Sequence, residues 1–313
     1  MKKRWDVITV GDIYIDHILM GFANWPEPGS ELYAPSYKCE LGGGAAITAC
    51  ALGLLGRSVA VLGVVGAKES DWIASVFAAH HADSGGLQQV DGHTGTTFSI
   101  STMNDRTLFS YAGPNSLLAA RLQDDAIIEW LAHARHVHFA FALPRTLALL
   151  ILPSLSKAGT TVSIDVGWKP AWYDDAANRA TCREVDVFLP NEKEASYLSA
   201  SVREGGTPQE LSVALERMGF ANAVIKLGAG GAASTYGAGC RVDAPAVEVV
   251  DTTGAGDAFD AGLIDGLLDN STVEVMLRRG CLLGSLSASS AGALQGLPRR
   301  QEVKEEYERC YKS

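Results

Sequence analysis

The feature that most constrains this chain is an alternation of short apolar segments with longer amphipathic ones, most regular after residue 124. Apolar runs bounded by turn residues predict strands, and longer segments with helical spacing predict helices. The expected strands are 6–11, 59–65, 136–141, 161–165, 185–189 and 223–227, and the expected helices are 124–134, 144–158, 175–183, 192–199, 208–219, 256–268, 273–290 and 301–311. Strand–helix repeats of this spacing specify a doubly wound, mostly parallel α/β sheet. No repeat or linker divides residues 1–313, so a single domain is expected.

A different sequence pattern occurs in the first half of the chain. Polar and apolar residues alternate between Thr94 and Tyr111, which predicts a β-hairpin with its turn at Asn104-Asp105. The stretch before Glu40 is irregular and rich in Pro and Gly. We expect 12–40 and 94–115 to form a small β-sheet lid over a substrate. The outer face of such a lid needs cover, and a homodimer built through two lids would supply it.

Charge and hydropathy exclude some classes of function. The formal net charge of -10 argues against a nucleic-acid partner, which requires an excess of Lys and Arg. No apolar run reaches the ~18 residues that a membrane span requires. The six cysteines are scattered without a CxxC pair, which favours reduced thiols. The chain is therefore expected to work in the cytoplasm, without a membrane partner.

The segment Val249-Val-Asp-Thr-Thr-Gly-Ala-Gly-Asp-Ala-Phe-Asp-Ala-Gly carries the strongest chemical signal. A strand is expected to end at Val250, and a helix rich in small residues to begin near Gly256. A helix start presents unpaired N–H groups and positive dipole charge, so Gly254, Ala255 and Gly256 suit a phosphoryl group. The carboxylate of Asp257, in the first turn, could take a proton from an attacking hydroxyl. A bare GxGD pattern also fits an ordinary capped helix.

The longer run Asp251-Thr-Thr-Gly-Ala-Gly-Asp resembles the C-terminal signature of the PfkB carbohydrate kinases, a ribokinase-like family. The helix that begins at Gly42-Gly-Gly-Ala-Ala resembles the family's N-terminal signature. Further landmarks follow the family's order: Gly11-Asp-Ile-Tyr-Ile-Asp16, Tyr111-Ala-Gly-Pro-Asn115, Pro190-Asn-Glu-Lys-Glu194 and Lys226-Leu-Gly-Ala-Gly-Gly231. The resemblance therefore spans almost the whole chain and implies a ribokinase-like fold.

The resemblance also implies a role for individual residues. Asp257 would be the catalytic base, and Gly254, Ala255 and Gly256 the anion hole for the transferred phosphoryl group. The substrate would contact Asp16, Tyr14, Gly42, Gly43 and Lys169. The ATP side would comprise Asn191, Lys226, Gly228 and Gly231, with Glu194 serving Mg²⁺ through water. Asp251 and Thr253 would help to hold a monovalent cation, K⁺ in this family.

Some positions depart from the family pattern. Ile47 replaces an asparagine that binds the sugar, and a branched alkane cannot make that hydrogen bond. Lys169 stands where arginine is common and Tyr14 replaces another polar contact, so the pattern points away from a strict ribokinase. Other interpretations remain open: Asp16 as a turn cap, Glu194 as a first-turn acid, and Lys226 with or without a nucleotide contact.

The expected function is ATP-dependent phosphorylation of a hydroxyl on a small sugar or sugar-like substrate. A nucleoside kinase of the same family and a non-catalytic sugar-binding protein are the alternatives. Gly228-Ala-Gly-Gly-Ala-Ala also fits a dinucleotide fingerprint, but that motif needs a helix next, and the residues after it predict a turn and a strand.

Overall fold

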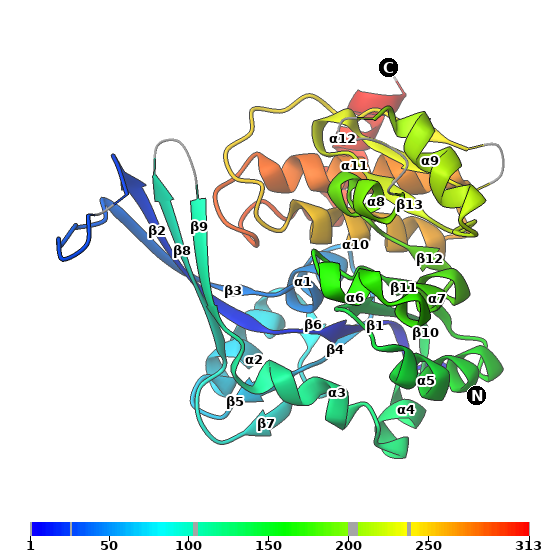
Figure 1. The fold of residues 1–313 in the computed structure, drawn as a ribbon, viewed down its shortest axis with the longest axis horizontal. Helices are drawn as coiled ribbons and strands as arrows, with labels where there is room; N and C mark the ends of the chain where they lie inside the picture. The colour runs from blue at the N-terminus through cyan, green and yellow to red at the C-terminus, as the bar shows by residue number, and fades with distance from the viewer. Residues whose placement is uncertain (1, 26, 103–105, 200–205, 237–238, 313) are drawn as a thin grey trace.

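The core of the protein is a six-stranded parallel sheet with helices on both faces (Figure 1). The computed structural model describes residues 2–25, 27–102, 106–199, 206–236 and 239–312. The strands, in spatial order, are β12 (Val187–Phe188), β11 (Thr161–Ile164), β10 (Ala134–Ala140), β1 (Trp5–Gly11), β4 (Val59–Leu62) and β6 (Ala82–Asp83). The doubly wound α/β sheet predicted from the alternation of segments is confirmed.

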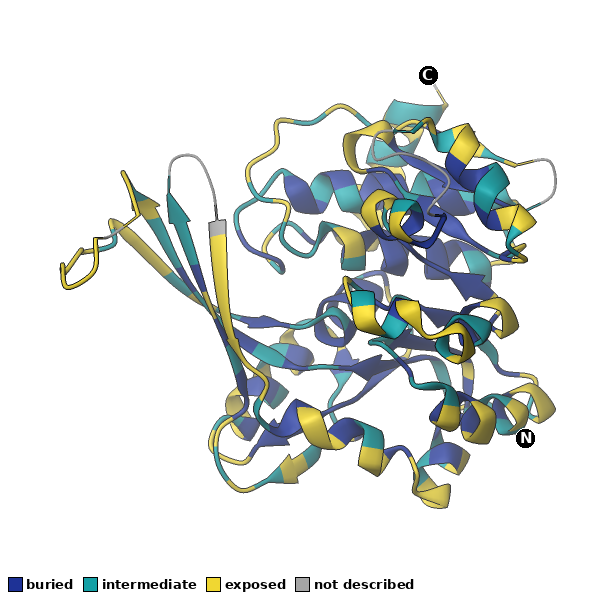
Figure 2. Ribbon diagram, viewed as in Figure 1, coloured by how far each residue is buried: buried dark blue, intermediate teal, exposed yellow. Residues whose placement is uncertain are grey.

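The apolar strands are buried on both faces, and their side chains alternate between two cores. Val7 packs with α1 (Gly44–Leu54), α2 (Ser70–Ala79), α10 (Ala255–Leu268), α11 (Val273–Ala288) and α12 (Arg300–Tyr311). Ile8, the next residue, packs with α4 (Asp125–Leu131), α5 (Arg145–Lys157), α7 (Ala176–Glu184), α8 (Glu192–Ser199) and α9 (Pro208–Arg217). Figure 2 shows the resulting pattern of buried strands and exposed outer helix surfaces.

Outside the main sheet, its covering helices and a second, smaller sheet described below, the remaining elements are short. They are β5 (Val64–Gly66), β7 (Gln88–Val90), the 3-10 helix η1 (Gly113–Leu117), α3 (Leu118–Arg121), α6 (Pro170–Asp174), β13 (Val224–Lys226), the 3-10 helix η2 (Gly228–Gly230), β14 (Ala232–Ser234) and β15 (Arg241–Val242). Strand β14 directly follows Gly231 and pairs with β13, so a strand, not the helix of a dinucleotide fingerprint, follows this glycine loop.

A small four-stranded sheet projects from the body (Figure 1). It consists of β3 (Ser36–Gly42), β2 (Tyr14–Phe22), β8 (Gly95–Thr102) and β9 (Arg106–Tyr111), in that order. The outer pairs are antiparallel and the central pair β2–β8 is parallel. The predicted small sheet is confirmed, whereas its turn at Asn104-Asp105 lies outside the described residues. That it acts as a lid, and that residues 1–313 form one domain, stay predictions.

A buried asparagine joins the chain segment that enters the small sheet before β2 to the segment that leaves it after β9. Asn115 follows β9, and its side chain accepts a hydrogen bond from the backbone N–H of Ile13 and donates one to the Ile13 carbonyl, both at 2.9 Å. Ile13 precedes β2, so one side chain satisfies both backbone polar groups of Ile13 at the point where the chain enters the small sheet.

The strand predicted to end at Val250 is absent, and this expectation was wrong. Val249 and Val250 are each 58% exposed and lie in an irregular segment. The backbone N–H of Val250 donates to the carbonyl of Ala288, at the end of α11. These β-branched residues have strand propensity, but this segment runs beside a helix end and has no neighbouring strand to pair with in the described structure.

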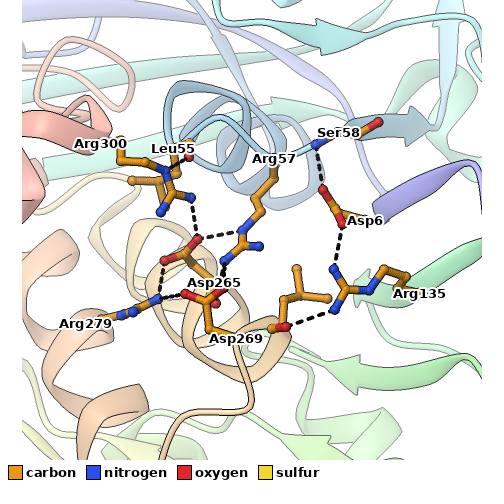
Figure 3. Close-up of polar contacts among 10 residues, drawn as sticks. Asp6, Leu55, Arg57, Ser58, Arg135, Asp265, Asp269, Arg279 and Arg300 are labelled. Carbon is orange, nitrogen blue, oxygen red and sulfur yellow. Dashed lines mark hydrogen bonds and ion pairs between the residues drawn. The ribbon is translucent and has the colours of Figure 1, made fainter.

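A charged cluster joins four helical segments (Figure 3). Asp265 near the end of α10 accepts hydrogen bonds from Arg57 Nε (2.7 Å), Arg279 (2.6 Å) and Arg300 (2.9 Å). Asp269 binds Arg57 and Arg279 at 2.6 and 2.7 Å. The arginines come from the segment after α1, from α11 and from the start of α12, so the cluster fixes these segments against α10.

No described helix is long and apolar enough to cross a membrane, and a cytoplasmic location stays a prediction.

Candidate active site

A glycine turn starts helix α10 and faces the small sheet. Gly254 has φ +75° and precedes the helix, which begins at Ala255. A Cβ at Gly254 would lie 2.9 Å from the Cβ of Ala293, so space as well as conformation requires glycine here. The turn has no side-chain cap at Gly254. The start of α10 and its dipole favour an anion at this turn, where the N–H of Ala255 donates only a long hydrogen bond of 3.3 Å to the Thr252 carbonyl.

Asp251 stabilises this turn through hydrogen bonds with Thr253 and Gly292. One carboxylate oxygen accepts hydrogen bonds from the N–H (2.9 Å) and the hydroxyl (2.7 Å) of Thr253. The other oxygen accepts from the N–H of Gly292 at 3.0 Å. Asp251 and Thr253, predicted to help hold a monovalent cation, are thus in direct contact with each other beside the turn.

Asp257 lies in the first turn of α10, beside the start of α1. A Cβ at Gly44 would lie 2.9 Å from its carboxylate oxygen Oδ1, so the two helix starts meet at this carboxyl group. Burial, together with the negative charges of Asp165 and Asp16, raises the pKa of Asp257 to about 7, against an opposing effect of the Lys226 charge. A carboxyl group that titrates near neutral pH is suited to accept a proton from a hydroxyl.

Asp257 lines a cavity of about 220 Å³ between the small sheet, the start of α1 and the glycine turn. The lining residues are Tyr14, Asp16, Ile18, Gly43, Gly44, Ile47, Thr97, Ser99, Leu108, Ser110, Thr253, Gly254 and Asp257. The cavity therefore brings together predicted substrate residues from the N-terminal segment and the GAGD turn more than 200 positions later. Ile47, the departure from the family's asparagine, lines this cavity as well.

Two glycines beside the cavity are required by close packing. A Cβ at Gly42 would lie 2.0 Å from Asp16 Oδ2, so the Asp16 carboxylate rests on this glycine. Gly43 has φ +95°, and a Cβ there would lie 2.1 Å from the carbonyl oxygen of Asp12. Lys169 is not among the lining residues and lies near Asp12. Burial raises the pKa of Asp12, and the positive charge of Lys169 offsets part of this rise.

The hydroxyl-bearing residues Thr97, Ser99 and Ser110 also line the cavity, and we had not singled them out in the sequence. The hydroxyls of Thr97 and Ser110 lie 3.1 Å apart. Ser99 is 6% exposed, and its hydroxyl has no hydrogen-bond partner in the described part of the chain. The signal was the alternation in β8, because residues 97 and 99 must share a face, but only the structure shows which face meets the cavity.

The predicted nucleotide residues Asn191 and Glu194 form hydrogen bonds with each other. Glu194 accepts from the N–H and the side-chain amide of Asn191 at 2.9 and 2.8 Å, and its own N–H donates to Asn191 Oδ1 at 2.9 Å. Glu194 is buried, and burial together with the charge of Asp165 raises its pKa to about 7. The pair forms a reciprocal cap at the start of α8, which is the structural role left open for Glu194.

The glycine loop after β13 has two different constraints. Gly231 has φ +87°, and a Cβ there would lie 1.9 Å from the carbonyl oxygen of Val242. Gly228 has φ +55° with nothing within 4 Å of a Cβ position. Gly231 is therefore fixed by packing, whereas Gly228 lies in a loop whose backbone is open to a ligand.

Lys226, the last residue of β13, directs its ammonium group to internal carboxylates. Its Nζ atom lies 2.6 Å from Asp165 Oδ2 and 3.1 Å from Asp260 Oδ1. A nucleotide contact for this side chain stays a prediction.

The comparisons with known proteins agree with this geometry. The model of the pfkB family carbohydrate kinases matches residues 5–300. The 2-dehydro-3-deoxygluconokinase of Bacillus subtilis is 26% identical over 96% of this chain and 94% of its own length. Ribokinase of Arabidopsis thaliana, solved with ribose and ATP, superposes with a TM-score of 0.84 at 22% identity, covering 98% of this chain and 99% of its own.

A nucleoside kinase from Burkholderia thailandensis, solved with inosine, superposes with a TM-score of 0.79 at 19% identity, covering 98% of this chain and 99% of that one. At these identities the two solved structures show the fold alone. The family match extends over most of the chain, from β1 to the first residue of α12. The chain therefore belongs to the pfkB family and is an ATP-dependent carbohydrate kinase.

Proposed function

We propose that the cavity binds a small sugar or sugar-like acceptor and that Asp257 accepts the proton of the hydroxyl to be phosphorylated. The observation that carries the proposal is that Asp257, the Gly254 turn and Asp16 line one cavity. As the acceptor oxygen bonds to the γ-phosphorus of ATP, its proton passes to Asp257 and the bond to the leaving ADP oxygen breaks. Gly254, Ala255 and Gly256 would stabilise the charge on the transferred group.

The acceptor would be gripped by polar groups from the small sheet. The Asp16 carboxylate and the Ser99 hydroxyl are the groups we assign to substrate hydroxyls, with Tyr14 and the backbone of Gly42 and Gly43 beside them. Lys169 would contact the acceptor from the edge of the cavity. A buried hydroxyl without a partner costs free energy, which a ligand hydroxyl would recover.

A nucleoside is the second candidate acceptor. Ile18, Ile47 and Leu108 give the cavity apolar lining, which suits a base or a sugar face without hydroxyls. ADP release measured over a panel of monosaccharides, sugar acids and nucleosides tests both candidates. Turnover of one class identifies the acceptor, and binding without ADP release would support the non-catalytic alternative.

Replacement of Ser99 by Ala is expected to raise the KM for the acceptor about 3- to 10-fold, because one hydrogen bond is lost. The KM for ATP should stay unchanged. Ser101→Ala, on the same strand but outside the cavity lining, is the matched control. Equal acceptor KM values in the wild type and the Ser99 variant would remove Ser99 from the binding site.

ATP would lie across the open loop at Gly228 and near Asn191, Lys226 and Gly231. Glu194 fits an indirect role toward Mg²⁺, because both of its oxygens already accept hydrogen bonds from Asn191. The oxygen atoms of Asp251 and Thr253 are suitable donors for K⁺ beside the glycine turn. When bound, Mg²⁺ would neutralise charge on the phosphates.

We expect activity to be abolished by chelation of Mg²⁺ and to be higher in K⁺ than in Na⁺. Initial rates at constant ionic strength with each chloride salt measure this. Equal rates in the two salts would refute the proposed K⁺ site without affecting the Mg²⁺ requirement.

The outer face of the small sheet supports the proposed homodimer. The aromatic residues of this face, which alternate with the cavity-lining ones, are 45–64% exposed: Tyr37, Phe98, Phe109 and Tyr111. An exposed aromatic sheet face is a surface that proteins tend to cover. Light scattering should give the mass of a dimer, and Phe98→Asp should give a monomer. A monomeric wild type would contradict the proposal.

A further inference from the structure

The ammonium group of Lys226 lies beneath Asp257, within a group of three carboxylates. Oxygen atoms of Asp165, Asp257 and Asp260 all lie within 4.8 Å of one another. Lys226 Nζ contacts Asp165 and Asp260 directly, at 2.6 and 3.1 Å. A Cβ at Gly256 would lie 3.5 Å from the same Nζ, which places the ammonium under the first turn of α10.

The three carboxylates are held in different states. Asp260 is fully buried, and burial raises the pKa of this carboxyl group well above its usual range, which favours its neutral form. Burial also acts to raise the pKa of Asp165, but the charge of Lys226 and hydrogen bonds from Lys226 and Asp260 together lower it, so Asp165 is ionised. Lys226 and Asp165 then form a neutral pair beside Asp257.

Other groups around this pair do not replace the charge of Lys226. His138 from β10 lies 3.9 Å from Asp260, and burial lowers its pKa to about 4, so it is neutral at pH 7. Asp16 acts electrostatically on Asp257 and Glu194 interacts with Asp165, and both of these groups are acidic. Among these groups Lys226 supplies the positive charge.

We propose that Lys226 is a positioning residue for phosphoryl transfer, whose ammonium group offsets the charge of Asp165 and holds Asp165 and Asp260 in place so that Asp257 is ionised when the acceptor binds. The inference rests on the proposed role of Asp257 as the base. It differs from the nucleotide contact that the sequence suggested, because the ammonium is directed toward carboxylates behind the base.

The test is the pH profile of kcat/KM in four variants. Lys226→Met should move the acidic limb to higher pH by about one unit or more, because an attractive charge a few ångströms away is lost. Asp165→Asn should move the limb to lower pH, because a repulsive charge is lost. The double variant removes both charges and should lie between the two single variants. Asp260→Asn is the comparison, and it should move the limb less than Asp165→Asn does, because burial favours the neutral form of Asp260.

Opposite shifts from two neighbouring residues are a readout that a purely structural role would not give. An acidic limb that stays in place in Lys226→Met, or shifts in the same direction in both single variants, would overturn the proposal. A roughly tenfold rise in the KM for ATP with an unmoved limb would instead assign Lys226 to the nucleotide. ATP affinity measured by calorimetry should otherwise stay within about twofold of wild type, since ΔG changes little when no contact is lost.

Two controls separate failure of this inference from failure of the proposed function. If Lys226→Met does not fold, the double variant is compared with Asp165→Asn, which differs from it only at residue 226. The double variant should then have its limb at the higher pH, and identical limbs would overturn the proposal. A wild type without an acidic limb would instead refute the assignment of Asp257 as the base.

Discussion

Replacement of Asp257 by Asn is expected to lower kcat by about 10²- to 10⁴-fold, the range typical for loss of a general base. The amide has the size of the carboxyl group, so the packing against Gly44 and the start of α1 is kept. The KM for ATP and the melting temperature should therefore stay close to wild type. Steady-state kinetics with the acceptor identified by the panel measures the effect.

Asp71→Asn is a matched control, because Asp71 is an exposed acid in the first turn of another helix, α2. It should leave kcat unchanged. An Asp257→Asn variant with more than half of the wild-type kcat would refute the assignment.

The same role predicts the pH dependence of the wild-type enzyme. Asp257 must be ionised to accept a proton, and its pKa is raised to about 7. The value of kcat/KM should therefore rise as the pH increases through about 7 and decline below it. This acidic limb should be missing from the residual activity of Asp257→Asn.

The second large effect is expected in stability. Asp265→Asn should lower the free energy of unfolding by about 3–5 kcal/mol, because a buried carboxylate shared by three arginines is lost and Asp269 remains to pair with only two of them. The Asp265 side chain is 5% exposed and receives hydrogen bonds from three arginines. The melting temperature should fall by about 5–8 °C for a chain of this size.

Asp269→Asn provides the matched comparison for Asp265. Asp269 binds two of the same arginines, but its side chain is 37% exposed, so solvent compensates for much of the loss. Thermal unfolding followed by circular dichroism should rank Asp265→Asn far below Asp269→Asn. Equal melting temperatures of the two variants would contradict a central role for Asp265.

The sequence predicted the parallel sheet because strands such as 6–11 are apolar on both faces, a pattern that depends on local residues alone. It placed residues 12–40 in the small sheet but did not locate the strands β2 and β3 within them, because β2 pairs with the distant β8 and β3 pairs with β2. It wrongly predicted a strand at Val249-Val250, because these residues have strand propensity but no neighbouring strand to pair with in the described structure. Pairing partners are a tertiary property, and strand propensity depends on them.

The site shows the same division. The turn at Gly254 and the position of Asp257 follow from a continuous motif, so their arrangement was readable from the sequence. The direction of the Lys226 side chain was not, because Asp165 and Asp260 come from other segments and only the fold brings them to its ammonium group. Ser99 was overlooked for a similar reason, since alternation defines two faces without saying which one meets a ligand.

Helix α10 has the glycine turn and Asp257 at its first residues and the arginine cluster around Asp265 near its last turn. Its 14 residues form one continuous helix about 21 Å long, so both features belong to a single rigid element. Elements of this kind open only when the whole cooperative unit unfolds. Loss of activity on heating should therefore coincide with global unfolding, and amide hydrogens in the middle of α10 should be among the slowest in the protein to exchange with solvent.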